Sequence, residues 1–204
     1  MLDRRKYLTG AETDRLLAAA AANTTTPSGR RDLVLVTLGV NSGLRISELA
    51  RLRRQDFGWD EGPYVDVLGS KRGASRRVWI SAAVGKQVQR WIDTLPPNPA
   101  APVFPVFEAG HLGRAMSTRN LAIRFTRIAR RAGLHHSPHA MRHTFALAWY
   151  RSNRDIVSLK QQLGHRNLKT TQVYATVPDD VQRSHAGAFP ALIPKRRLTS
   201  SPGG

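Results

Sequence analysis

The sequence of 204 residues has no cysteine, few acidic residues and no long hydrophobic run. Without cysteine there can be no disulfide, no cysteine nucleophile and no cysteine-ligated zinc or iron–sulfur site. No apolar stretch is as long as a membrane span, and the first residues lack the pattern of a secretory signal peptide. We therefore expect a soluble cytoplasmic protein that does not enter a membrane.

Two further absences concern nucleotide and metal chemistry. The chain has no glycine-rich phosphate-binding loop, and its acidic side chains do not cluster as they would in a two-metal nuclease. We therefore predict a protein that uses no nucleotide, no metal ion and no other cofactor.

The shortage of acidic residues leaves a large positive charge. Lys and Arg number 32 against 14 Asp and Glu, which gives a net charge of +18. Hydrophobic residues make up 41% of the chain, enough to form a core, so the chain as a whole is not a disordered basic tail. A positive field of this size favours a polyanion, and above all a nucleic acid, as the partner.

The spacing of apolar residues predicts a mainly α protein with a small antiparallel β-sheet, an α+β fold. Helices are expected over residues 10–22, 31–41, 47–54, 81–95, 117–132, 137–150 and 155–163, and in pieces over 168–186. Thr9 and Glu12 have the spacing of a capping box at the first of these helices. The stretch 23–29, rich in Thr, Pro, Ser and Gly, is expected to be a loop.

Strand patterns are short and few. Residues 64–68 and 76–80 alternate between apolar and polar, and the Gly- and Lys-containing stretch between them predicts a hairpin turn. Residues 103–107 are a candidate third strand, which Pro105 would confine to a sheet edge because proline lacks an N–H donor.

Several side chains could carry chemistry, although each alone has an ordinary explanation. His139 and Arg142 share a helix face three residues apart, as in any solvated basic face. Arg45 follows a helix-ending glycine, and Glu48 lies three residues on, where a carboxylate could orient the guanidinium group. Lys71, on the hairpin, is by itself one surface lysine among several.

Two more candidates lie further along the chain. His165 follows the glycine that ends the expected helix 155–163, where a solvent-exposed turn histidine is the usual case. Tyr174 comes nine residues later, and a lone tyrosine most often packs its ring half-buried.

Taken together and in order, these motifs resemble the tyrosine recombinase, or phage integrase-type, family. The sequence reads Gly-Leu-Arg-Ile-Ser-Glu-Leu around Arg45, a hairpin lysine, His-x-x-Arg-His-Thr-Phe-Ala from His139, Leu-Gly-His, and Thr-Thr-x-x-Tyr. The resemblance covers residues 8–186. It implies the fold of a tyrosine recombinase catalytic domain and the activity of a site-specific DNA recombinase.

The resemblance also implies a role for each matched residue. Tyr174 would attack a DNA phosphodiester and form a 3′-phosphotyrosine bond with no metal or ATP. Arg45 and Arg142 would hold the non-bridging phosphate oxygens, a task that suits the bidentate guanidinium group.

The remaining roles concern protons and support. By the same resemblance, Lys71 would protonate the leaving 5′-oxygen, with Arg72, the next residue, as the alternative acid. His139 would assist proton transfer at the tyrosine, His165 would hydrogen-bond the phosphate, and Glu48 would support the site.

The resemblance extends to stand-alone catalytic domains such as the fimbrial inversion recombinases. It implies a short basic arm at 1–8, a catalytic domain at 9–186, and a flexible tail at 187–204 that is a possible intersubunit connector. The expected partner is double-stranded DNA with specific recombination sites, bound by a homotetramer at the nucleoid. Further DNA contacts are expected from Arg4, Arg5, Lys6, Arg72 and Arg76.

Three other interpretations remain open from the sequence. A type IB topoisomerase uses a similar residue set but reseals the original strand. A DNA-binding protein with a vestigial site would keep the basic surface without the chemistry. A histidine metal site could use His139 and His143, one helical turn apart, with His135 and His136 nearby.

Overall fold

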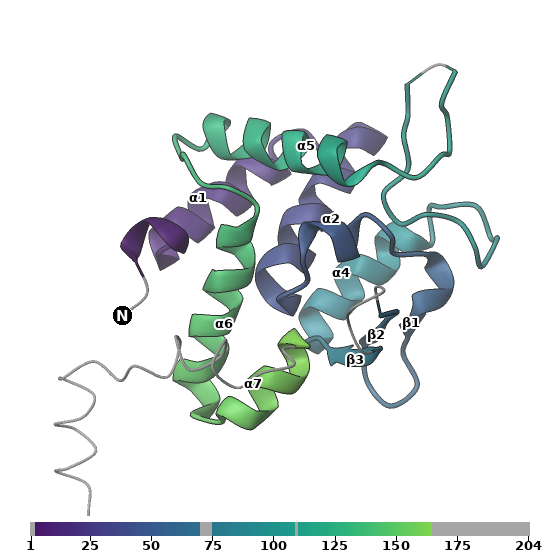
Figure 1. Cartoon of the computed structure of the whole chain (residues 1–204). Helices are drawn as coiled ribbons and strands as arrows, with labels where there is room; N and C mark the ends of the chain where they lie inside the picture. Colours follow the sequence, from purple (N-terminus) through teal and green to yellow (C-terminus); the bar gives the residue numbers. More distant parts are fainter. Residues whose placement is uncertain (1–2, 70–74, 109, 165–204) are drawn as a thin grey trace, which may run out of the picture.

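The structure is a computed structural model that describes residues 3–69, 75–108 and 110–164. Helix α2 lies in the middle of the molecule and contacts α1, α4, α5 and α6 (Figure 1). Within the described ranges, no helix is both long and apolar enough to cross a membrane. The helices are α1 (Gly10–Ala21), α2 (Pro27–Ser42), α3 (Ile46–Leu49), α4 (Ala82–Ile92), α5 (Thr118–Arg131), α6 (His139–Asn153) and α7 (Ile156–Leu163), with 3-10 turns η1 (Arg4–Lys6) and η2 (Arg54–Asp56).

A three-stranded antiparallel sheet packs beside the helices. Its strands are β1 (Phe57–Gly58), β2 (Tyr64–Val67) and β3 (Arg76–Trp79), with β2 in the middle. The register places Val65 opposite Val78, and both side chains are fully buried. The neighbouring pair, Asp66 and Arg77, projects from the opposite face, because side chains alternate along a strand.

The helix ends follow from local sequence. Thr9 and Glu12 form the predicted capping box, in which the Thr9 side chain accepts from the Glu12 N–H and the Glu12 carboxylate accepts from the Thr9 N–H. Helix α2 starts earlier than predicted, at Pro27, so part of the expected loop 23–29 is helical. Thr26 caps it by accepting from the Gly29 N–H at 3.1 Å, and proline is tolerated in a first turn.

Two expectations about local structure are wrong. The third strand of the sheet is β1, and residues 103–107 do not belong to the sheet. Within them, Pro105 forms an isolated antiparallel bridge with Ala115. The expected helix 47–54 ends at Leu49, because the backbone of the next residues pairs elsewhere. The Val103 N–H donates to the Leu52 carbonyl, and the Arg54 N–H donates to the Ala101 carbonyl.

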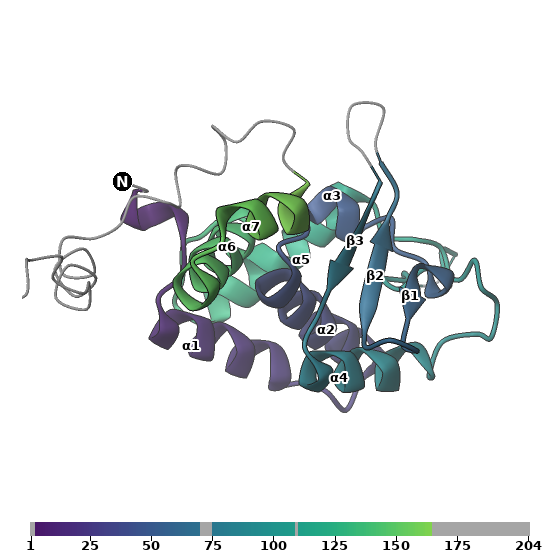
Figure 2. The ribbon, with the colours of Figure 1, turned by 90° about the horizontal axis from the view of Figure 1, so that it is seen from below.

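The core is continuous around α2 and extends to α5 and the sheet. Leu35, Leu38, Leu121 and Phe125 are fully buried in it. A smaller cluster, Phe145, Ala146, Leu159 and Leu163, joins α6 to α7. This packing leaves α3, α7 and the hairpin ends of β2 and β3 on one side of the molecule, away from α1 and α4 (Figure 2).

Candidate active site

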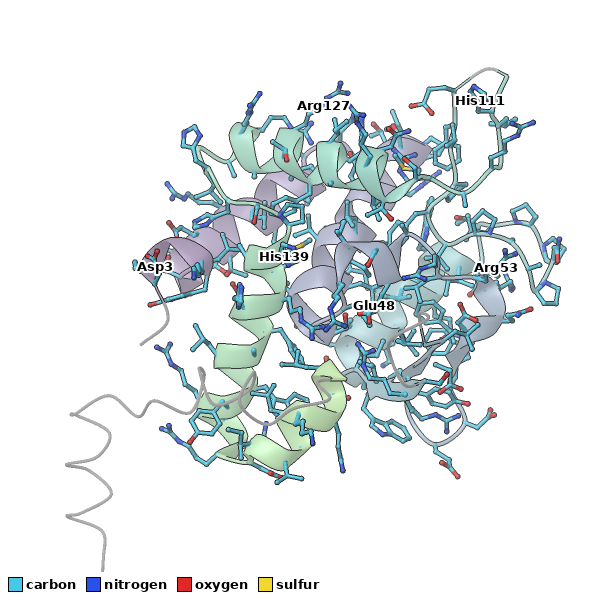
Figure 3. All side chains as sticks on the ribbon, viewed as in Figure 1. Asp3, Glu48, Arg53, His111, Arg127 and His139 are labelled. Atoms are coloured by element: carbon cyan, nitrogen blue, oxygen red, sulfur yellow. The ribbon has the colours of Figure 1, made fainter. Side chains whose placement is uncertain are left out.

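Glu48 is the centre of the candidate site. In Figure 3 it lies in the middle of the view, between His139 at the start of α6 and Arg53 on the other side. Its carboxylate reaches back to the start of α3 and accepts from the Arg45 N–H at 2.8 Å, as a capping glutamate does. It also accepts from Arg45 Nη1 at 3.1 Å. The contact between Arg45 and Glu48 that the spacing suggested is therefore present.

Arg142 enters the same site from α6 and is almost completely buried. Its Nη1 lies 3.9 Å from Glu48 Oε2 and donates to the Gly43 carbonyl at 2.6 Å. Its Nη2 donates to the Leu163 carbonyl at 2.8 Å. The Arg142 guanidinium group thus links the end of α2 to the end of α7. Arg142 and Arg45 both contact Glu48, although 97 positions separate them in the sequence.

Arg76 contributes a third guanidinium group, from β3. Its Nη1 and Nη2 donate to the two oxygens of Glu48 at 3.0 and 3.1 Å, a bidentate pair. Its Nε donates to the Gln162 carbonyl at 2.8 Å. The expectation that Arg76 contacts DNA stays a prediction, but the structure places its guanidinium group on Glu48, at 11% side-chain exposure.

Gln162 is a residue that sequence reasoning missed. Its side-chain amide accepts from the Trp79 N–H at 3.1 Å and donates to the Trp79 carbonyl at 3.0 Å, so it continues the sheet as a further strand would. This contact fixes the end of α7 against β3. No spacing or motif could have revealed it, because 83 positions separate the partners.

The charges around Glu48 keep it ionised. Burial would raise the pKa of this carboxyl, but the hydrogen bonds and charge of Arg76, with those of Arg45, outweigh burial and lower the pKa below 4.5. A carboxylate and three guanidinium groups therefore stand together with a net positive charge. Such a site favours a phosphate-sized anion.

Two histidines of α6 lie beside this cluster. His139 is exposed at the first position of the helix. His143 is half-buried, and its pKa is lowered by burial first and then by the neighbouring charges of His139, Arg142 and Lys6. Among the residues that the structure describes, no three His, Asp or Glu side chains are grouped to hold a metal ion.

The N-terminal segment packs close to these histidines. The Leu8 N–H donates to Thr144 Oγ1 of α6 at 2.8 Å, and Leu8 is buried. Arg4 forms an ion pair with Glu12 at 2.6 Å, and Lys6 is exposed. DNA contacts by Arg4 and Lys6 stay predictions.

The other predicted site residues lie outside the described residues. They are Lys71, Arg72, His165 and Tyr174, together with the side chain of Arg5. The structure describes the residues that precede two of these segments in the sequence: Gly69, two positions before Lys71, and Gly164, directly before His165. Gly164 ends α7, and α7 lies on the side of the molecule that carries α3 (Figure 2).

Known proteins match this chain over most of its length. The family model described as Phage integrase family matches residues 6–180. Tyrosine recombinase XerC of Xylella fastidiosa is 34% identical over 165 residues, which are 80% of this chain and 54% of XerC. A crystal structure of XerA recombinase is 25% identical with a TM-score of 0.71, over 91% of this chain and 65% of that one.

A third similarity is to a structure solved with DNA. XerH site-specific recombinase, bound to its palindromic difH substrate in a post-cleavage complex, has a TM-score of 0.71 and 24% identity. The alignment covers 91% of this chain and 53% of XerH.

This chain belongs to the phage integrase family, the tyrosine recombinases. The predicted α+β fold of a tyrosine recombinase catalytic domain is confirmed, and so is the resemblance drawn from the motifs. The chain spans about half the length of the curated relative it matches, 54% of XerC.

Proposed function

We propose that this chain is the catalytic part of a site-specific recombinase that cuts and rejoins double-stranded DNA. The observation that carries the proposal is the meeting of Arg45 and Arg142 at one ionised carboxylate, Glu48. Family membership and the DNA-bound structure of XerH support it.

In the proposed reaction, the phenol oxygen of Tyr174 attacks phosphorus and the bond to the 5′-oxygen breaks. The 5′-oxygen leaves as a hydroxyl after taking a proton from Lys71, and the tyrosine keeps the 3′-phosphate. His139 assists removal of the phenol proton, and His165 hydrogen-bonds the phosphate.

Arg45 and Arg142 act on the charge that gathers on the non-bridging oxygens. The Arg45 side chain is 40% exposed, so its guanidinium group is at the surface. The Arg142 side chain is only 6% exposed, and two backbone carbonyls hold its guanidinium group. Preorganised cations of this kind stabilise a phosphoryl-transfer transition state without reorganisation. We therefore propose that no metal ion is needed.

ATP is not needed either, because the phosphotyrosine bond conserves the energy of the broken phosphodiester. Attack by a 5′-hydroxyl reverses the step, and attack by the hydroxyl of a second duplex exchanges strands.

Exchange between two duplexes cuts four strands, so we propose a homotetramer on paired sites. The segment 187–204 is the proposed connector between protomers, and chromosomal DNA at the nucleoid is the proposed location.

Trapping of covalent adducts tests the chemistry. Wild-type protein incubated with fragmented DNA from the source genome should yield protein–DNA adducts that survive detergent. Tyr174→Phe should bind DNA and yield none, while Tyr150→Phe, the matched control on α6, should yield the wild-type amount. An adduct formed by Tyr174→Phe, or none by wild type, would overturn the proposal.

The same assay separates metal-dependent from metal-independent cleavage. Adducts should form at an unchanged rate in excess chelator and without ATP. Activity that chelator removes and magnesium restores would contradict the proposed charge stabilisation.

Deletion of residues 187–204 tests the assembly. The shortened chain should bind a single site normally but fail to pair two sites or recombine them. Recombination at the wild-type rate would show that the connector is not in this segment.

A further inference from the structure

Arg76 occupies a position where the sheet calls for an apolar residue. It pairs with Val67 across β2 and β3, so its side chain leaves the same face as Val65, Val67 and Val78, which are buried. A charged group on a core face costs free energy unless a partner compensates it. The partner here is Glu48, 28 positions away, with which Arg76 forms two hydrogen bonds.

The contacts of Arg76 reach three parts of the candidate site. Besides Glu48 of α3 and its own strand, it holds the Gln162 carbonyl in the last turn of α7. Gly164 follows with φ of +65°, and a Cβ there would lie 2.8 Å from Arg76 Nη1. In the sequence, His165 directly follows Gly164, and Lys71 lies five positions before Arg76.

The contact between Arg76 and Glu48 changes the net charge of the cluster. The Arg76 guanidinium group donates to both oxygens of Glu48. By comparison, the Arg45 guanidinium group donates to Glu48 through Nη1 at 3.1 Å, and Arg142 Nη1 lies 3.9 Å from it. With Arg76 present, three guanidinium groups and one carboxylate leave two positive charges. Without it, the carboxylate would neutralise one of the two arginines that are proposed to hold phosphate.

We propose that Arg76 is a positioning residue that offsets the charge of Glu48, so that the positive charges of Arg45 and Arg142 act on the DNA phosphate without being offset by this carboxylate. The inference rests on the proposed function, and it assigns Arg76 a role in cleavage that does not require it to touch DNA. It also explains why a bidentate guanidinium group, rather than an apolar side chain, stands on the inner face of β3.

A double-mutant cycle tests the inference. The variants are Arg76→Gln, Glu48→Gln and the double variant, and Arg77→Gln is the matched control. Arg77 is the adjacent arginine on the outer face of the same strand, where it pairs with the exposed Asp66. The measurements are the rate of adduct formation at saturating DNA, the Kd for a single site, and the thermal unfolding of each protein.

Arg76→Gln should slow adduct formation about tenfold or more, because Glu48 would then offset the charge of one of the two arginines that are proposed to hold the phosphate. Its Kd should change less than the rate, because most phosphate contacts are elsewhere. The double variant should be faster than Arg76→Gln, because it has no carboxylate to offset the charges of Arg45 and Arg142. Arg77→Gln should stay within about twofold of wild type, as expected for an exposed ion pair.

The cycle also gives an answer if Arg76→Gln does not fold. In that case, Glu48→Gln is compared with the double variant, and loss of Arg76 should cost little once the carboxylate is absent. A rate for the double variant about tenfold or more below that of Glu48→Gln would then overturn the inference. If Arg76→Gln folds, a wild-type rate for it would overturn the inference as well. Absence of adducts with wild-type protein would instead contradict the proposed function.

Discussion

Asp32 and Glu48 each form ion pairs with more than one arginine, but the two clusters differ in their exposure to solvent. Asp32 lies between Arg31, at 3.5 Å, and Arg124, whose Nε donates to it at 3.2 Å. Arg31 is 1% exposed, donates to the Pro105 carbonyl and lies under the Phe107 ring. Glu48 is almost as buried, but one of its arginines, Arg45, is 40% exposed.

The difference separates an arginine cluster that supports the fold from one that can bind a ligand. The Asp32 cluster joins α2, α5 and the loop after Phe104, and the charges of Asp32 and Arg31 are buried in protein. The Glu48 cluster reaches solvent through Arg45, which precedes α3. Helices α3 and α7 lie on the same side of the molecule (Figure 2). Burial and pairing are common to both clusters, so the greater exposure of Arg45 is what distinguishes the cluster that is proposed as the site.

The largest expected effect belongs to the closed cluster. Asp32→Ala should lower the free energy of unfolding by about 3–5 kcal/mol, because it leaves a buried arginine without its carboxylate. Asp14→Ala, on the exposed face of α1, is the control and should change it by less than about 0.5 kcal/mol. Chemical denaturation measures both. If the two variants unfold alike, the Asp32 cluster does not support the fold.

A smaller effect is expected where α7 meets the sheet. Gln162→Ala should lower the free energy of unfolding by about 1–3 kcal/mol, because the polar backbone groups of Trp79 lose their partner. It should also slow adduct formation, since α7 carries the chain to His165. Gln161→Ala, the exposed neighbour, is the control for both measurements. Equal adduct rates for the two variants would show that the contact between Gln162 and Trp79 does not affect cleavage.

The next prediction compares two glycines in the same backbone conformation. Gly164 and Gly133 both have positive φ, but a Cβ would meet Arg76 only at Gly164, and open space at Gly133. Each alanine variant should lose about 1–2 kcal/mol through backbone strain. Gly164→Ala alone should also slow adduct formation, by displacing Arg76. Equal cleavage rates would show that the position of Arg76 does not matter.

The smallest expected effect is the acid dependence of the open cluster. The pKa of Glu48 is below 4.5 in the folded protein, so its contribution to stability is complete above that pH and is lost as the pH falls through the folded pKa. The stability advantage of wild type over Glu48→Gln should therefore shrink in acid. Denaturation at a series of pH values measures it, and an advantage that grows in acid would refute the assignment.

The sequence by itself determined most of the helices that the structure describes, the capping box and the two strands with a clear alternation; the helical pieces expected at 168–186 lie outside the described residues. These depend on neighbours three or four positions apart, or on a period of two, so they are visible locally. The motifs likewise identified the family and named Arg45, Glu48 and Arg142. The third strand was placed wrongly, because the backbone of the segment after Ala101 pairs with residues far from it in sequence.

Only the tertiary structure decided how the site is held together. Arg76, one of two adjacent arginines, faces inward because the register of β2 and β3 places it opposite Val67, and its partner Glu48 belongs to another element. Gln162 acts through a contact between a helix and a strand that 83 positions separate. Such contacts leave no periodicity or spacing in the sequence, because packing of the core brings their elements together.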